Sequence, residues 1–175
     1  MLGLARALRF PLALLGLLVA FATSSGANGL AAPEGKVLLE VTGAIERTNT
    51  ANAAVFDLAM LSSLGVQQLR TTTAWTEGEQ LFEGVPLRRV LEAVGARGDR
   101  LRAVALNGYE ATIALDDPRA ARAFLAFRRN GSPMRVRDKG PLWIVFPWSE
   151  HLELMDDMVR NWSVWQLTGL EVQGS

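Results

Sequence analysis

The stretch FRRNGSPMRVRDKGPLWIVFPW, residues 127–148, decides the fold class of this chain. Its Asn130-Gly131 dipeptide favours a tight reversal between two strands. The apolar run over residues 142–146 is typical of a strand buried on both faces, and Pro147 ends it. A hairpin followed by a buried strand is therefore expected in the second half of the chain.

The segments on either side of this stretch mix strand and helix patterns without regular alternation. Pro86 opens a helix whose apolar residues recur at helical spacing, and Gly95 follows as its C-terminal cap. Asn107-Gly108 predicts a second hairpin. This mixture favours the α+β class. The other expected elements are strands over residues 36–43, 66–73, 101–106, 109–115 and 162–172, and helices over residues 56–64, 117–124 and 152–160.

The first 31 residues have the order of a secretory signal peptide. Arg6 and Arg9 precede an apolar run over residues 10–21, and small residues follow over 22–32. The run is short for a membrane-spanning helix, although an uncleaved anchor is the alternative. We expect cleavage between residues 22 and 32, a single domain over 32–175, and a periplasmic location.

Composition excludes some classes of function. The chain has 18 basic and 18 acidic residues, and without the signal segment it retains 16 basic residues against all 18 acidic ones. This balance lacks the basic footprint of a nucleic-acid-binding protein. The chain has no cysteine, so it can offer neither a thiolate metal ligand nor a thiol nucleophile. His151 is its only histidine, which makes a zinc site improbable.

Three segments in this order carry a resemblance to a known family. Residues 69–91, LRTTTAWTEGEQLFEGVPLRRVL, end in a Gly-x-Pro-Leu helix start; residues 127–148 combine a glycine hairpin with a strand ending in Pro-Trp; residues 160–172, RNWSVWQLTGLEV, close the chain. Together they resemble the molybdopterin-binding domain of the sulfite oxidase superfamily over residues 37–172. The resemblance implies that family's fold, with mixed β-sheets and short surrounding helices.

The chain departs from the family's enzymes where they bind molybdenum. Their metal-binding cysteine lies in a loop that reads Thr71-Thr72-Thr73 here. A threonine hydroxyl is a poor substitute, because it stays protonated near neutral pH and lacks the polarisable sulfur. The arginine after the proline of the enzymes' Gly-x-Pro strand is also missing, with Trp143 nearby instead.

A small, exported, cysteine-free branch of the superfamily resembles this chain. Some of its members are understood as periplasmic pterin-binding proteins that pass ligand occupancy to a membrane-bound cyclic-di-GMP enzyme. The resemblance therefore implies a free, metal-less pterin as ligand and the periplasmic domain of a membrane-bound signalling protein as partner. Two alternatives stay open: a molybdopterin-dependent oxidoreductase with an oxygen ligand on its metal, and a ligand-free scaffold that only contacts a partner.

A pterin is a flat bicycle that needs an aromatic partner for its face and fixed polar groups for its edge. Trp75, in the loop after the threonines, and Trp148, at a strand end, are the candidates for the face. Either could instead pack on the core, as we expect of Trp143, while Trp162 and Trp165 are expected on opposite faces of one strand. Candidates for the edge are Thr72, Thr73, Thr76, Asn107, Tyr109, Arg137, Lys139 and Gly140.

The edge candidates also have simpler explanations. Asn107 can serve the turn alone, because Asn-Gly forms a reversal by itself. Arg137 and Lys139 belong to a cluster of five cations over residues 128–139, and most such clusters are solvated surface. The sequence leaves these alternatives open.

Overall fold

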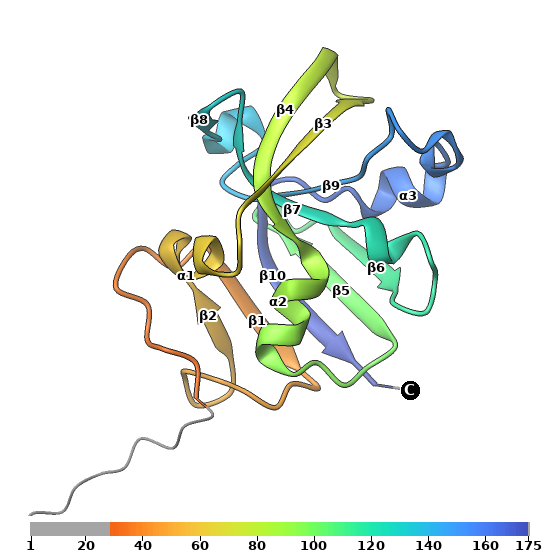
Figure 1. The fold of residues 1–175 in the computed structure, drawn as a ribbon. Helices are drawn as coiled ribbons and strands as arrows, with labels where there is room; N and C mark the ends of the chain where they lie inside the picture. The colour runs from red at the N-terminus through yellow and green to blue at the C-terminus, as the bar shows by residue number, and fades with distance from the viewer. Residues whose placement is uncertain (1–28, 175) are drawn as a thin grey trace, which may run out of the picture.

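The structure, a computed structural model, describes residues 29–174 (Figure 1). Residues 1–28 of the predicted signal peptide lie outside this range, so that prediction is not tested. Two β-sheets make up the fold, as the α+β class predicts. The first sheet has the order β2 (Ala54–Phe56), β1 (Leu39–Gly43), β10 (Leu167–Gln173), β5 (Arg100–Ala105), β6 (Glu110–Ala114).

The second sheet has the order β3 (Gln67–Thr73), β4 (Thr76–Pro86), β7 (Phe124–Arg129), β8 (Ser132–Pro133), and β9 (Trp143–Val145) also pairs with β7. In the first sheet β1 and β10 run parallel, whereas the other strand pairs of both sheets are antiparallel. The β3–β4 hairpin extends beyond the rest of the molecule (Figure 1).

Three short α-helices surround the sheets: α1 (Leu58–Ser63), α2 (Leu87–Val94) and α3 (Asp157–Trp162). Helix α2 follows the sequence prediction closely. Its buried residues Leu87, Val90 and Val94 lie at helical spacing, and Gly95 ends it in the left-handed conformation. Burial of each of these side chains stabilises the fold by about 1.5–3 kcal/mol.

Both hairpins predicted from Asn-Gly are confirmed. Gly108 lies at φ 81° between β5 and β6, and Asn130-Gly131, both at positive φ, join β7 to β8. The apolar run over residues 142–146 contains β9, as expected. These predictions succeed because turn chemistry and continuous burial are local properties of the sequence.

Four element predictions were wrong in part. Residues 152–160 are not one helix, because a 3₁₀ turn, Leu152–Leu154, precedes α3. Residues 56–64 end one strand and form α1 after it, because Asp57 caps the helix. Residues 117–124 form only a 3₁₀ turn, Ala120–Arg122, since Phe124 already pairs with Val145. Residues 162–172 are not one strand: α3 runs through Trp162 and β10 begins at Leu167.

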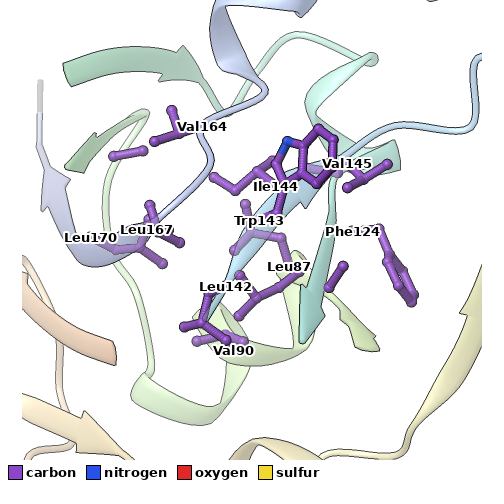
Figure 2. Packing of buried hydrophobic residues seen from close by; sticks show 14 of the residues in the cluster. Leu87, Val90, Phe124, Leu142, Trp143, Ile144, Val145, Val164, Leu167 and Leu170 are labelled. Carbon is purple, nitrogen blue, oxygen red and sulfur yellow. The ribbon is translucent and has the colours of Figure 1, made fainter. Parts of the chain in front are cut away.

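The core is centred on β9 and helix α2 (Figure 2). Leu142, Trp143 and Ile144 are fully buried, and they pack with residues from α2 and β10. Trp143 is therefore a core residue, as predicted. Within residues 29–174, no helix is both long and apolar enough to span a membrane.

Candidate functional site

The threonine loop at the end of β3 is fixed by hydrogen bonds within the protein. Thr71 is fully buried, and its Oγ1 accepts from the backbone N–H of Ser149 at 3.1 Å. The backbone N–H of Thr72 donates to Ser149 Oγ at 2.9 Å. The hydroxyls of Thr73 and Thr76 bond each other across the hairpin at 2.8 Å. The loop is thus rigidly attached to the segment that follows β9.

Trp75, at the turn after this loop, lies at the centre of a cluster of tryptophans. Its ring centroid is 5.1 Å from that of Trp165 and 6.0 Å from those of Trp143 and Trp148, each in an edge-on arrangement. Such edge-to-face contacts are favourable beyond the area they bury. Trp75 is thereby packed against the core on one side while its other side stays accessible.

Trp75 and Trp165 form one corner of a cavity of about 280 Å³. Their ring planes are 71° apart, so a flat ligand that stacks on one indole meets the other edge-on. Among the described residues, neither indole N–H has a hydrogen-bond acceptor in the protein, so both can donate to a ligand. The cavity is lined by Trp75, Asn107, Tyr109, Arg160, Asn161, Ser163, Val164 and Trp165.

Two residues with amide side chains, Asn107 and Asn161, line this cavity. Asn107 Oδ1 accepts from the backbone N–H of Tyr109 at 3.1 Å, which makes the hairpin turn and leaves the Asn107 NH₂ group available. The Tyr109 hydroxyl donates to the backbone carbonyl of Asn161 at 3.1 Å and so ties the hairpin to α3. Within residues 29–174, the Asn161 amide has no side-chain hydrogen bond. Asn107 therefore serves both the turn and the cavity wall.

A second cavity of about 190 Å³ lies beside the threonine loop. It is lined by Thr72, Thr73, Ala74, Trp148, Met155 and Arg160. Arg160 lines both cavities, and its guanidinium donates to Asp157 Oδ1 at 3.1 Å and to the backbone carbonyl of Met155 at 3.4 Å. Trp148 contributes to this wall but is nearly buried, and its indole N–H donates to the carbonyl of Leu154 at 2.9 Å.

Lys139, Gly140 and Arg137 lie outside both cavity linings. The Lys139 ammonium lies 4.2 Å from the centre of the Trp165 ring, on the side chain that walls the first cavity. Burial lowers the pKa of Lys139, and the charge of Arg129 lowers it further. Gly140 is a packing residue, because a Cβ there would lie 2.1 Å from the carbonyl oxygen of Met134. Arg137 is exposed and lies beside Asp138.

The structure thus places the predicted site residues in two different cavities or outside both. The first cavity brings together Trp75, Asn107 and Tyr109, and the second brings together Thr72, Thr73 and Trp148. Thr76 supports the second cavity through its bond to Thr73. Lys139 lies outside the first cavity but contacts Trp165, which is one of its lining residues.

Sequence reasoning missed the wall supplied by α3 and the residues after it. Arg160 and Asn161 were overlooked although residues 152–160 were predicted to be helical, and Trp165 was only placed with Trp162 on opposite faces of one predicted strand. The signal was present in Asp156, which caps α3 by accepting from the backbone N–H of Val159 at 2.9 Å. Arg119 also donates to Asp156, and its guanidinium lies 5.5 Å from the centre of the Trp162 ring. These contacts fix α3 against the rest of the fold.

The family model for the oxidoreductase molybdopterin binding domain matches residues 39–153. The chain belongs to this family. Among solved structures, the fold is similar to the sulfane dehydrogenase SoxCD from Paracoccus pantotrophus, with a TM-score of 0.54 and 20% identity. That similarity covers 78% of this chain but only 38% of the SoxCD chain, and at this identity it concerns the fold alone. No curated protein matches the sequence.

The family implies a pterin-type cofactor, and this chain has no cysteine where the family's enzymes bind molybdenum. The threonine hydroxyls at the family's cysteine loop already bond within the protein, and none can supply a soft ligand. Among residues 29–174, no three His, Asp or Glu side chains gather where they could hold a metal ion. The first cavity, by contrast, has two indole and two amide side chains among its lining residues.

Proposed function

We propose that this member of the oxidoreductase molybdopterin binding domain family is an exported pterin-binding protein without redox chemistry of its own. Its role is to sense a free pterin in the periplasm and to pass ligand occupancy to a membrane-bound signalling protein that controls cyclic-di-GMP. One observation carries the proposal: two tryptophans, whose indole N–H groups have no acceptor among the described residues, line one cavity together with two asparagines, and the nearby threonine loop has no thiolate.

The size and lining of the first cavity support a small, flat ligand. Its volume of about 280 Å³ lies at the low end for small-molecule sites. Trp75 or Trp165 offers a face on which a bicycle can stack. Asn107 and Asn161 offer both donors and acceptors, which is the pattern that the pyrimidine edge of a pterin requires.

The same arrangement argues against turnover. An oxidoreductase of this family needs a metal ligand that holds molybdenum next to the substrate, and the chain offers only hydroxyl groups that are already hydrogen-bonded. A hydroxyl would have to lose its proton and its internal partner before it could bind a metal. The polypeptide is therefore suited to bind and to orient an organic ring.

The signalling half of the proposal rests on the resemblance to the small, exported, cysteine-free branch. An apparent signal peptide precedes the domain in the sequence, with Arg6 and Arg9 before an apolar run. A protein exported to the periplasm without chemistry of its own needs a membrane-spanning partner to influence a cytoplasmic enzyme. The partner is expected to recognise the pterin-bound form.

The test is to purify the full chain from the periplasm of a bacterium that makes pterins, and to analyse what it carries. We expect an organic pterin, detected by its fluorescence after release in acid, without stoichiometric molybdenum by mass spectrometry of the metal. A cysteine-containing member of the family, purified in the same way, is the control for metal retention. Stoichiometric molybdenum together with sulfite oxidation or sulfoxide reduction would overturn the proposal.

A further inference from the structure

The charges of this protein are distributed unevenly, although they nearly balance in total. Residues 128–139 carry five basic side chains and one acidic side chain, Asp138. The rest of the described chain carries eleven basic and seventeen acidic side chains. A positive surface on an otherwise acidic protein directs the approach of negatively charged partners.

The fold brings two of these cations to one depression. The β7–β8 hairpin and the segment before the turn Val136–Asp138 place Arg129 and Arg135 in its lining. The depression has a volume of about 490 Å³, and Arg137 lies next to it, beside Asp138. Its lining residues are Arg129, Ser132, Pro133, Met134, Arg135 and Asp138.

Asp138 neutralises only part of this charge. Arg135 Nε donates to the Asp138 carboxylate at 2.7 Å, while Arg137 Nε lies 3.9 Å from it. The hydrogen bond from Arg135 lowers the pKa of Asp138, and the charges of Arg135, Arg137 and Arg129 lower it further. Among the described residues, Arg129 forms no ion pair. The depression therefore keeps an excess of positive charge with guanidinium groups available.

We propose that this basic depression is the docking surface for an acidic stretch of a partner polypeptide. Guanidinium groups pair with carboxylates through two parallel hydrogen bonds, and several of them around a concave surface fit a run of Asp or Glu side chains. The proposal rests on the proposed function only in assuming that a partner exists. The surface lies on the β7–β8 hairpin, outside the linings of both cavities.

The surface suits a polypeptide better than an anionic membrane. Membrane-surface segments combine basic residues with apolar side chains that insert among the lipids. Of the large exposed apolar side chains of the described residues, only Val136 belongs to this segment. A depression can also accommodate a segment of polypeptide, whereas a lipid surface is flat on this scale.

The test uses the full mature chain and a fluorescein-labelled peptide of alternating Glu and Ser, with binding followed by fluorescence anisotropy at low ionic strength. The variant is Arg129→Gln/Arg135→Gln. Its matched control is Arg88→Gln/Arg97→Gln, which makes the same change in net charge at exposed positions elsewhere. We expect the first variant to lose peptide affinity by about tenfold or more and the control by less than about twofold.

Equal losses in both variants, or no binding by the unchanged protein, would overturn the docking surface. It would also fall if vesicles of phosphatidylglycerol, and not the peptide, bound in a manner that depends on Arg129 and Arg135. Pterin binding is measured on the same samples and should be the same in all three proteins. If none of them binds pterin while the peptide result holds, the docking surface stands and the proposed function fails. If the double variant does not fold, Arg135→Gln against Arg97→Gln makes the same comparison.

Discussion

Four tryptophans belong to one cluster centred on Trp75, but two of them are buried and two are partly exposed. Trp143 and Trp148 are buried, and their indole N–H groups donate to Ser163 Oγ and to the carbonyl of Leu154. Trp75 and Trp165 are partly exposed, line the first cavity, and have no internal acceptor among the described residues. The same side chain thus builds the core where its N–H is satisfied and lines an open cavity where it is not.

The largest loss of stability is expected when one of the two buried tryptophans is replaced. Trp143→Ala should lower the free energy of unfolding by about 3–5 kcal/mol, because it removes a fully buried ring and leaves a cavity. Urea unfolding followed by circular dichroism measures this loss. If that variant does not fold, Trp143→Phe should still cost about 1–3 kcal/mol through the bond to Ser163. Stability equal to that of the unchanged protein would place Trp143 outside the core.

Replacement of a partly exposed tryptophan should instead weaken ligand binding more than it lowers stability. Trp75→Ala should weaken pterin binding by about 1–3 kcal/mol through the loss of stacking, and it should cost less stability than Trp143→Ala. Quenching of the remaining tryptophan fluorescence by added pterin measures the affinity. Replacement of Leu152, an exposed side chain outside both cavity linings, by Ala is the control and should leave affinity unchanged. Unchanged affinity in Trp75→Ala would remove this tryptophan from the site.

This contrast also explains how much could be predicted from the sequence. Trp143 could be assigned to the core because it lies within the apolar run over residues 142–146. Both hairpins followed from Asn-Gly, and α2 from its periodicity and Gly95. These features depend on neighbours in the sequence, which a single chain displays.

The remainder of the site depends on contacts between distant segments. Trp75 meets Trp165 across 90 positions of sequence, and the threonine loop bonds Ser149. No local pattern encodes such pairings. Arg160 and Asn161 were missed for the same reason: a helix was predicted over residues 152–160, but no local pattern shows that the end of α3 lines a cavity with Trp75.

Replacement of Asp156 tests whether the part of the cavity lining that α3 supplies depends on the stability of this helix. Asp156→Ala removes the N-cap of α3 and its contact with Arg119, and a lost cap costs about 1 kcal/mol. Because α3 carries Arg160 and Asn161 into the cavities, we expect pterin affinity to fall together with stability. Calorimetric titration and urea unfolding measure the two quantities.

Asp57→Ala is the matched control for this prediction. Asp57 caps α1 by accepting from the backbone N–H of Met60 at 2.8 Å, and it also accepts from Gly35 at 2.7 Å. Its loss should destabilise the fold without weakening pterin binding, since α1 lines neither cavity. Equal losses of affinity in both variants would mean that the cavity responds to stability in general and not to α3.

The smallest expected effect concerns Lys139, which contacts both pairs through Trp165 and Trp143. Lys139→Met keeps most of the apolar stem but removes a cation–π contact of about 0.5–1 kcal/mol, and it also removes the cost of burying an ammonium group. Burial lowers the pKa of Lys139 from 10.5, so the folded state releases this proton at a lower pH than the unfolded state. Between those two pKa values the unfolded state binds more protons, and the free energy of unfolding rises with pH. Any advantage of Lys139→Met in urea unfolding should therefore shrink as the pH rises from neutral towards 10.5. A difference that stays constant over this range would show that the ammonium is as well solvated in the folded protein as in the unfolded chain.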